Sequence, residues 1–285
     1  MAIGKPIIED WLRGILADPT TKIPCSAEDF PVVEGIRDAR IFLRNTHGFS
    51  VWLEGQEAYE KWEEDGIPTH IKDSKGRVIK DQIQAFNYEI DYDRPTYSHF
   101  VLSGKILDVG GAAGLLRQFL SPNTKYVSID PNLRAPLNVS VQKAEAYTCL
   151  RNDFSFLAAM AEFLPFKEKS FDFVHMRSML DHVQIPDLAL IEAHRVLVDN
   201  GALLVGISIE GGREGHETIE EKAKETIRGI LGKIGIKKWQ DHHIWHPTLS
   251  NLRKLIESNR FKVEEIYWQP KFENRVVYVK AIKIK

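Results

Sequence analysis

The chain has 285 residues, of which 43% are hydrophobic and 27% charged, as is ordinary for a globular protein with one large domain or two smaller ones. A formal net charge of −2 argues against a protein that coats nucleic acid along its whole surface, although this net charge is compatible with a local basic patch. No apolar run approaches the ~18 residues of a membrane span, and the first residues lack a signal-peptide core. Cys25 and Cys149 show neither metal-ligand spacing nor a disulfide framework, so a reducing cytoplasm is the expected location.

The first two regions in chain order are predicted to be an N-terminal segment and a cap. Within residues 1–50, apolar side chains at helical spacing predict a short amphipathic helix over 7–15, which Pro19 would stop. Strand and turn character follows over 30–43. Residues 51–103 are polar, acidic and aromatic, and we expect helices and loops that pack over a cleft, although a solvated face would also explain their charges.

Residues 104–210 alternate nearly continuous apolar runs with helical patterns. Such runs are typical of parallel strands that are covered on both faces. A helix over 187–197, followed by Gly201, connects the last two runs. The alternation predicts an α/β fold with a doubly wound, Rossmann-like sheet. The five predicted strands are 105–110, 125–131, 155–160, 170–178 and 201–209.

The remaining residues extend this domain, which we expect to span 104–285. Glycines near the start of residues 211–247 and an apolar helical face predict a lid-like insertion, or a helix that merely packs. A helix over 249–259 and strands over 261–269 and 275–284 follow. We expect the two strands to pair at the sheet edge, which gives seven strands, mostly parallel, with an antiparallel last strand.

The stretch LDVGGAAG, residues 107–114, predicts a strand that ends in a glycine turn, and the apolar pattern over residues 115–120 predicts a helix after the turn. It does not fit the dinucleotide fingerprint, because Ala112 and Leu115 stand at the third and sixth places of a run that starts at Gly110. An acid at Asp108 suits an ammonium group, and Asp130, at the end of the next strand, can hold both hydroxyls of a ribose. A ligand with an amino-acid head and a ribose is S-adenosylmethionine. The alternative without a ligand is that the glycines and the two acids only form turns.

Four motifs in order resemble class I S-adenosylmethionine-dependent methyltransferases, with a core like that of the type 11 group. They are LDVGGAAG at 107–114, SIDP at 128–131, the stretch from Met160 to Val183, and RVLVDNGALLVGIS at 195–208. The first is similar to the family's D-x-G-x-G-x-G, with Ala112 in place of the middle glycine. The resemblance implies S-adenosylmethionine as the cofactor.

Roles carried over from the family fall on matching positions. Gly110 and Gly111 would line the methionine part, and Asp130 would hold the ribose. Ala161 and Glu162 lie in the adenine loop, where Met160 replaces a frequent acid, so packing on Met160 and Pro131 would hold the adenine. The full set of cofactor-binding candidates is Asp108, Gly110, Gly111, Ala112, Gly114, Asp130, Pro131, Met160, Ala161, Glu162 and Arg177.

Histidines after the fourth predicted strand and near residue 243 are candidates for the base that a hydroxyl acceptor needs. Asp181 and His182 lie in a loop that borders the acceptor pocket in the family, but His182 could equally pack or hydrogen-bond locally. The stretch QDHHIWHPT, residues 240–248, adds Asp241, His242, His243 and His246. Pro247 argues against a helical His242–His246 metal pair, so no metal is predicted. Tyr97 and His99 are weaker candidates.

The N-terminal segment is similar to a small zinc-ribbon-like module that precedes some bacterial methyltransferases, where FPV-x-x-G-I recurs. Its zinc cysteines are missing, since Cys25 stands alone. If the resemblance holds, residues 1–50 form a structural module without metal.

The sequence therefore predicts methyl transfer, with O-methylation of a small molecule or sugar as the first hypothesis. The first alternative is N- or C-methylation of a small metabolite or quinone-like ring. The second alternative is that the chain is a non-catalytic protein that binds S-adenosylmethionine or serves as a partner subunit. Nucleic acid is not expected as the acceptor, because no N-P-P-Y motif for flipped bases is present.

Overall fold

A computed structural model describes residues 2–46, 48–65, 77–213, 226–227, 243–270 and 275–285. An eight-stranded sheet runs through it in the order β1-β6-β5-β4-β7-β8-β10-β9. The central strands are β4 (Lys105–Val109), β5 (Lys125–Asp130), β6 (Phe154–Ala158), β7 (Phe171–Arg177) and β8 (Leu197–Ser208). They pair in parallel, which confirms the predicted doubly wound α/β class.

The last two strands and the first one complete the sheet. β10 (Val276–Lys283) pairs antiparallel with both β8 and β9 (Phe261–Trp268), so the predicted antiparallel last strand is confirmed. It lies inside the sheet, and only β9 forms the edge on that side. β1 (Pro6–Ile7) pairs with β6 at the opposite edge and makes an eighth strand beyond the predicted seven.

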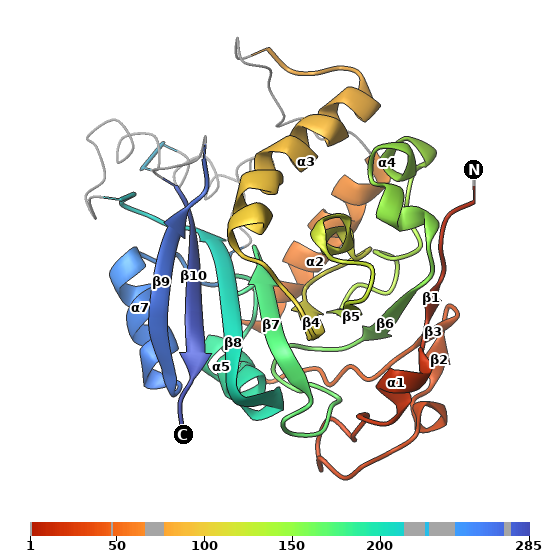
Figure 1. The fold of residues 1–285 in the computed structure, drawn as a ribbon, viewed down its shortest axis with the longest axis vertical. Helices are drawn as coiled ribbons and strands as arrows, with labels where there is room; N and C mark the ends of the chain where they lie inside the picture. Colours follow the sequence, from red (N-terminus) through yellow and green to blue (C-terminus); the bar gives the residue numbers. More distant parts are fainter. Residues whose placement is uncertain (1, 47, 66–76, 214–225, 228–242, 271–274) are drawn as a thin grey trace.

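Helices cover both faces of the sheet, as Figure 1 shows. On one face, α5 (Pro186–Val196), α7 (Leu249–Ser258) and the N-terminal segment contribute to the larger apolar core. On the other face, α3 (Gln82–His99) packs Tyr97 against alternate residues of β4, β5 and β6. This division follows from the period of two along each strand, which sends Ile106 to one core and Leu107 to the other.

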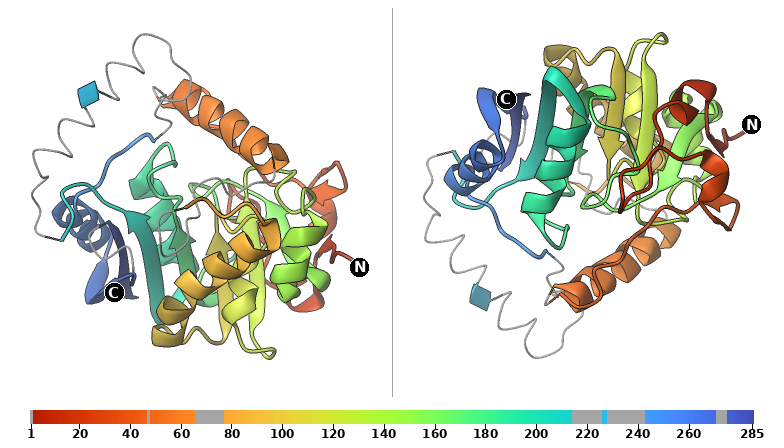
Figure 2. Two further views of the ribbon diagram at one scale, coloured as in Figure 1. Left: turned by 90° about the horizontal axis from the view of Figure 1, so that it is seen from above. Right: turned by 90° about the horizontal axis from the view of Figure 1, so that it is seen from below.

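Shorter elements and one further helix lie around this framework. They are α1 (Asp10–Arg13), η1 (Ala27–Asp29), the hairpin of β2 (Val32–Val33) and β3 (Ile36–Arg37), α2 (Phe49–Asp65), η2 (Leu115–Phe119), α4 (Val141–Ala146) and η3 (Thr148–Arg151). Figure 2 shows α2 and α3 as separate helices on different sides of the molecule. Both fall in the region predicted to form a cap.

Two local predictions were wrong. The helix expected over 7–15 is only α1, because Ile7 belongs to β1 and its backbone pairs with β6. The helical pattern after the glycine turn forms the five-residue 3₁₀ helix η2, which begins after Gly114 at a left-handed φ of 75°. Among the described residues, no helix is both long and apolar enough to cross a bilayer.

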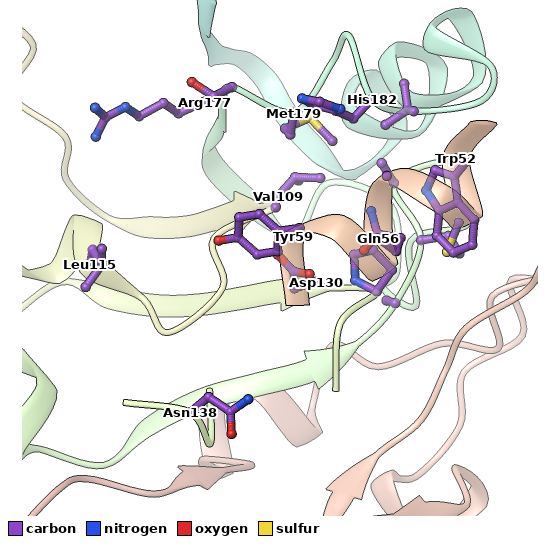
Figure 3. A pocket seen from close by; sticks show the side chains of 18 of the residues that line it. Trp52, Gln56, Tyr59, Val109, Leu115, Asp130, Asn138, Arg177, Met179 and His182 are labelled. Carbon is purple, nitrogen blue, oxygen red and sulfur yellow. The ribbon is translucent and has the colours of Figure 1, made fainter. Parts of the chain in front are cut away.

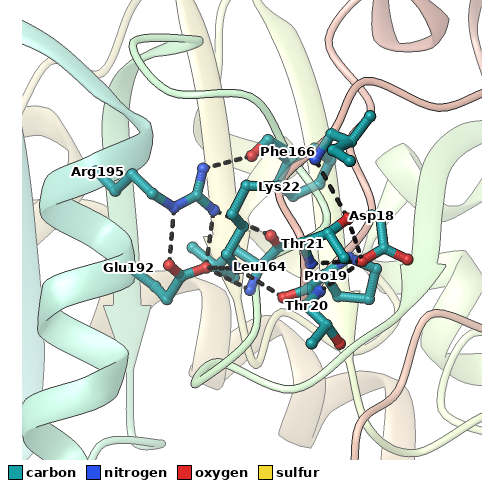
Figure 4. A network of polar contacts seen from close by, with 10 residues as sticks. Asp18, Pro19, Thr20, Thr21, Lys22, Leu164, Phe166, Glu192 and Arg195 are labelled. Carbon is teal, nitrogen blue, oxygen red and sulfur yellow. Dashed lines mark hydrogen bonds and ion pairs between the residues drawn. The ribbon is translucent and has the colours of Figure 1, made fainter.

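A partly buried ion-pair network joins the N-terminal segment to the main domain (Figure 4). Lys22 donates from Nζ to Glu192 of α5 at 2.6 Å, and Arg195 donates to the same carboxylate at 2.7 Å. Glu192 also accepts from the backbone N–H of Leu164 at 2.9 Å. Arg195 donates onward to the carbonyl oxygens of Leu164 and Phe166. The network fixes the loop that follows β6, which carries the predicted adenine-binding residues.

Candidate functional site

A cavity of about 590 Å³ opens at the carboxyl ends of the central strands, within the size range of small-molecule sites (Figure 3). In an open α/β sheet, ligands bind at this edge. Seven of the predicted cofactor-binding residues line it: Gly110, Asp130, Pro131, Met160, Ala161, Glu162 and Arg177. The predicted catalytic residue His182 lines it as well. Four stretches that are far apart in the sequence therefore meet at one cavity.

The glycine turn brings backbone close to the cavity floor. Gly110 has a φ of 70°, and a Cβ there would lie 2.8 Å from Cβ of Met179, so no side chain fits. Ala112 also has a left-handed φ, of 44°, which is rare for a residue with a side chain. Its N–H donates to Oδ2 of Asp130 at 3.2 Å. Gly111, Ala112 and Gly114 shape this turn, but they are not among the residues that line the cavity.

Asp130 ends β5 with its carboxylate at the cavity. The side chain is 7% exposed, and Oδ1 accepts from the N–H of Asn132 at 2.9 Å. These backbone contacts fix the carboxylate at the strand end. The predicted ribose contact remains a prediction that this placement suits.

Asp108 lies beneath the turn and does not line the cavity. Its Oδ1 lies 2.7 Å from Nδ1 of His175, and Tyr126 donates its hydroxyl to Oδ2 at 2.6 Å. His175 in turn lies 3.1 Å, at Nε2, from the hydroxyl of Tyr97. Burial, followed by the nearby Asp108 charge, raises the pKa of Tyr126 well above its usual value. Both carboxylate oxygens of Asp108 thus have protein partners, and its predicted contact with an ammonium group stays a prediction.

The adenine loop is almost fully buried. Met160 and Glu162 are each 2% exposed and line the cavity. Oε1 of Glu162 accepts from the N–H of Gln184 at 2.9 Å, just before α5, whereas Oε2 has no hydrogen-bond partner among the described residues. Burial raises the pKa of this carboxyl above its usual value.

Arg177 reaches the cavity from the end of β7, where α3 holds it. It forms a bidentate ion pair with Asp93, in which Nη2 and Oδ1 are 2.7 Å apart. Gln269 donates to the same Oδ1 at 2.9 Å. The guanidinium is therefore positioned before any ligand arrives.

The predicted acceptor-side residues form a cluster. The carbonyl of Asp181 accepts from the N–H of Ile244 at 2.8 Å, which brings the segment from His243 to His246 beside the loop after β7. The ring centroids of His182 and His243 are 4.5 Å apart, and those of His243 and His246 are 5.5 Å apart. His182 is the member of this cluster that lines the cavity.

The remaining residues predicted on the acceptor side do not line the cavity or are not described by the structure. His99 stacks on Tyr267 and lies 2.5 Å from Glu265, so it belongs to the β9 side and not to the cavity lining. Tyr97 belongs to the Asp108 network. Asp241, His242 and most of the predicted lid over 211–247 lie outside the described residues.

The sequence reasoning missed the side chains that α2, α3 and α4 bring to the cavity. They include Trp52, Gln56, Tyr59, Phe86, Glu89 and Lys143. The one available signal was the aromatic and acidic character of residues 51–103, which led to the expected cap over a cleft. Figure 3 shows Trp52, Gln56 and Tyr59 on the helix beside the strand ends.

A sequence model of a methyltransferase domain matches residues 107–205, a stretch that begins within β4 and ends within β8. These residues thus form a methyltransferase domain. Its sheet consists of the strands β4 to β10 with one extra strand, β1, at the edge beside β6. The cavity lining fits the predicted cofactor, S-adenosylmethionine: Gly110 exposes backbone, Asp130 offers a carboxylate and Met160 an apolar wall.

Two solved structures share the fold of this methyltransferase. One is the 1,6-didemethyltoxoflavin-N1-methyltransferase of Burkholderia thailandensis, with its substrate and S-adenosylhomocysteine bound. It is 15% identical, has a TM-score of 0.51, and covers 88% of this chain and 95% of its own. The other, from Bacillus halodurans and provisionally described as a methyltransferase, is 17% identical with a TM-score of 0.51 and covers 68% and 99%.

An archaeal protein without assigned function is similar to this chain in sequence. This protein of Methanocaldococcus jannaschii is 24% identical over 229 residues, which is 76% of this chain and 92% of the relative. The similarity thus extends well beyond residues 107–205.

Proposed function

We propose that this methyltransferase methylates a hydroxyl group of a small molecule or sugar. The observation that carries the proposal is the placement of His182 on the cavity wall, with Asp181 and His243 around it. A hydroxyl is a weak nucleophile until a base takes its proton. The imidazole of His182 on the cavity wall can act as that base. Residues 181–183 lie in the loop that begins after Arg177, the last residue of β7, so they stay close to the end of that strand.

When bound, S-adenosylmethionine supplies a methyl group on a sulfonium that is already activated for in-line displacement. His182 would accept the proton of the acceptor hydroxyl and so leave its oxygen as the nucleophile for that methyl group. Asp181, 3.9 Å from Nε2 of His182 and mostly buried, stabilises the imidazolium that forms. Asp130 and the adenine loop hold the cofactor, and Trp52 and Tyr59 help to enclose the acceptor.

N-methylation of a planar ring is the second candidate. The aromatic lining from Trp52, Tyr59 and Phe86 favours a flat acceptor. The structural neighbour from Burkholderia thailandensis, an N1-methyltransferase, supports the same class of acceptor. A reducing cytoplasm is the location we propose for either activity, and Cys25 and Cys149 are free thiols.

The first experiment is calorimetric titration of S-adenosylmethionine and S-adenosylhomocysteine into the wild type and Asp130→Ala. We expect tight binding that the substitution abolishes. Absence of binding to the folded wild type would overturn the enzymatic reading and favour a non-catalytic protein. With binding established, a screen of hydroxylated small molecules, sugars first, identifies the acceptor by transfer of a labelled methyl group.

A pair of histidine variants then tests the base. His182→Gln should lose turnover and retain S-adenosylhomocysteine affinity. His99→Gln changes an exposed histidine that does not line the cavity and should leave both unchanged. Full turnover in His182→Gln would refute the base assignment, and methylation of ring nitrogens alone would favour the second candidate.

A further inference from the structure

Asp181, His182 and His243 bring three metal-binding atoms together beside the cavity. One carboxylate oxygen and one nitrogen of each imidazole lie within 4.8 Å of one another. Nε2 of His243 is 3.6 Å from Oδ2 of Asp181, and Nε2 of His182 is 3.9 Å from Oδ1. Bonds of about 2.0–2.2 Å around a tetrahedral ion place ligand atoms roughly 3.3–3.6 Å apart. The three groups thus need only a small contraction to hold one ion.

The backbone builds this cluster from two distant segments. Ile244 and Trp245 both direct their N–H groups to the carbonyl oxygen of Asp181, at 2.8 and 3.3 Å. A second tie follows at once, because the N–H of Glu210 donates to the carbonyl of Pro247 at 2.8 Å. These bonds hold His243 opposite the loop after β7, so the three side chains face one another by construction.

The burial of Asp181 points to a cationic partner. The residue is only 6% exposed, and its Oδ1 has no hydrogen-bond partner among the described residues. A buried carboxylate is costly unless a cation or hydrogen bonds compensate its charge. The side chains of His182 and His243 are 36% and 43% exposed, so an ion can reach the cluster from solvent.

We propose that Asp181, His182 and His243 bind one divalent transition-metal ion at the wall of the cavity. Two imidazoles and one carboxylate favour Zn²⁺, Co²⁺ or Fe²⁺ over Mg²⁺, which prefers oxygen ligands and water. Three protein ligands leave coordination positions open, as in catalytic sites. His182 also lines the cavity, so an acceptor with an oxygen or nitrogen donor can complete the coordination.

The role of the ion rests on the proposed function, whereas its binding does not. In the metal-loaded protein, His182 is a ligand and the ion lowers the pKa of a coordinated acceptor hydroxyl. In the metal-free protein, the same imidazole keeps its lone pair for the proton. The metal content of the protein therefore determines whether the bound ion or the free imidazole of His182 promotes loss of the acceptor proton.

The test is titration of Zn²⁺ into the full chain, prepared without a polyhistidine tag, followed by the visible spectrum of the Co²⁺-loaded protein. We expect one equivalent to bind, with the d–d bands of a low-coordinate site. His243→Ala should weaken binding at least about tenfold, since even outer-shell partners of a ligand alter affinity by 10–100-fold. His99→Ala, which removes an exposed histidine paired with Glu265, is the matched control and should bind as the wild type does.

Equal affinity in His243→Ala and the wild type, or no binding to the wild type, would overturn the metal site. S-adenosylhomocysteine titration of the same samples reports the cofactor site separately. Lost metal binding with intact cofactor binding defeats only this inference, and the reverse result defeats only the proposed function. Affinity that does not fall on acidification would also overturn it, because imidazole must be neutral to bind a metal.

Discussion

Substitution of Gly111 by alanine tests whether the contacts beneath the glycine turn support both the fold and the cofactor site. An ideal Cβ at this position would lie 2.5 Å from Oδ2 and 2.6 Å from Cγ of Asp108, and 2.6 Å from Oγ of Ser128. The carboxylate cannot move without loosening its contacts with Tyr126 and His175. Overpacking costs about 1–3 kcal/mol and a lost charged hydrogen bond about 1.5–3, so we expect a loss of about 2–4 kcal/mol.

Two measurements on this variant, with a matched control, decide the point. Urea unfolding gives the change in free energy, and calorimetry gives the affinity for S-adenosylhomocysteine, which should fall as the turn shifts. Gly14→Ala is the control, because its Cβ would meet nothing closer than 3.8 Å at a φ of −68°. That variant should stay within about 1 kcal/mol of the wild type. A Gly111→Ala protein as stable as the control, with unchanged affinity, would refute the reasoning.

Two further predictions concern buried carboxylates. Glu192→Gln removes the charge shared by Lys22 and Arg195, and should cost about 2–4 kcal/mol in urea unfolding, below the full value for a buried pair because the Lys22 side chain is 29% exposed. Glu257→Gln, in the exposed pair with Arg253, should change stability by less than about 1 kcal/mol, and equal losses in both would contradict the role of burial. Glu162→Gln should stabilise the protein at neutral pH, because burial raises the pKa of Glu162 and its ionised form is disfavoured in the folded state. Below the ordinary glutamate pKa of 4.5, Glu162 is protonated in both the folded and the unfolded state, so the stability advantage of the variant should disappear there. The advantage should grow as pH rises from 4.5 through the raised folded-state pKa, because the wild type loses stability over that range. A stability advantage that persists below pH 4.5 would contradict this explanation.

The parallel core was predictable because each strand is a long apolar run with a clear end. β1 was not, since two residues carry no periodicity and its pairing with β6 is a tertiary contact. The same holds for η2, where a helical pattern of five residues is too short to favour an α-helix once Gly114 sets the first turn. The division at residues 50 and 103 stays a prediction, as does the zinc-free module.

The cavity residues that belong to motifs were found in advance, whereas their partners were not. Asp108 meets His175 because β4 and β7 pair in a register that places the two residues side by side. Nothing in the sequence states that register, since 61 residues separate the end of β4 from the start of β7. Similarly, a helix such as α2 shows which residues are apolar but not which cavity they enclose.

The position of β10 has a consequence for how the protein is made. Residues 276–283 are inserted between β8 and β9, so the open edge of β8 has no partner until they leave the ribosome. An unpaired strand edge is a template for pairing with other chains. A released chain that is truncated between Trp268 and Val276 would expose the edges of both β8 and β9, and should therefore depend on chaperones more than the full chain does.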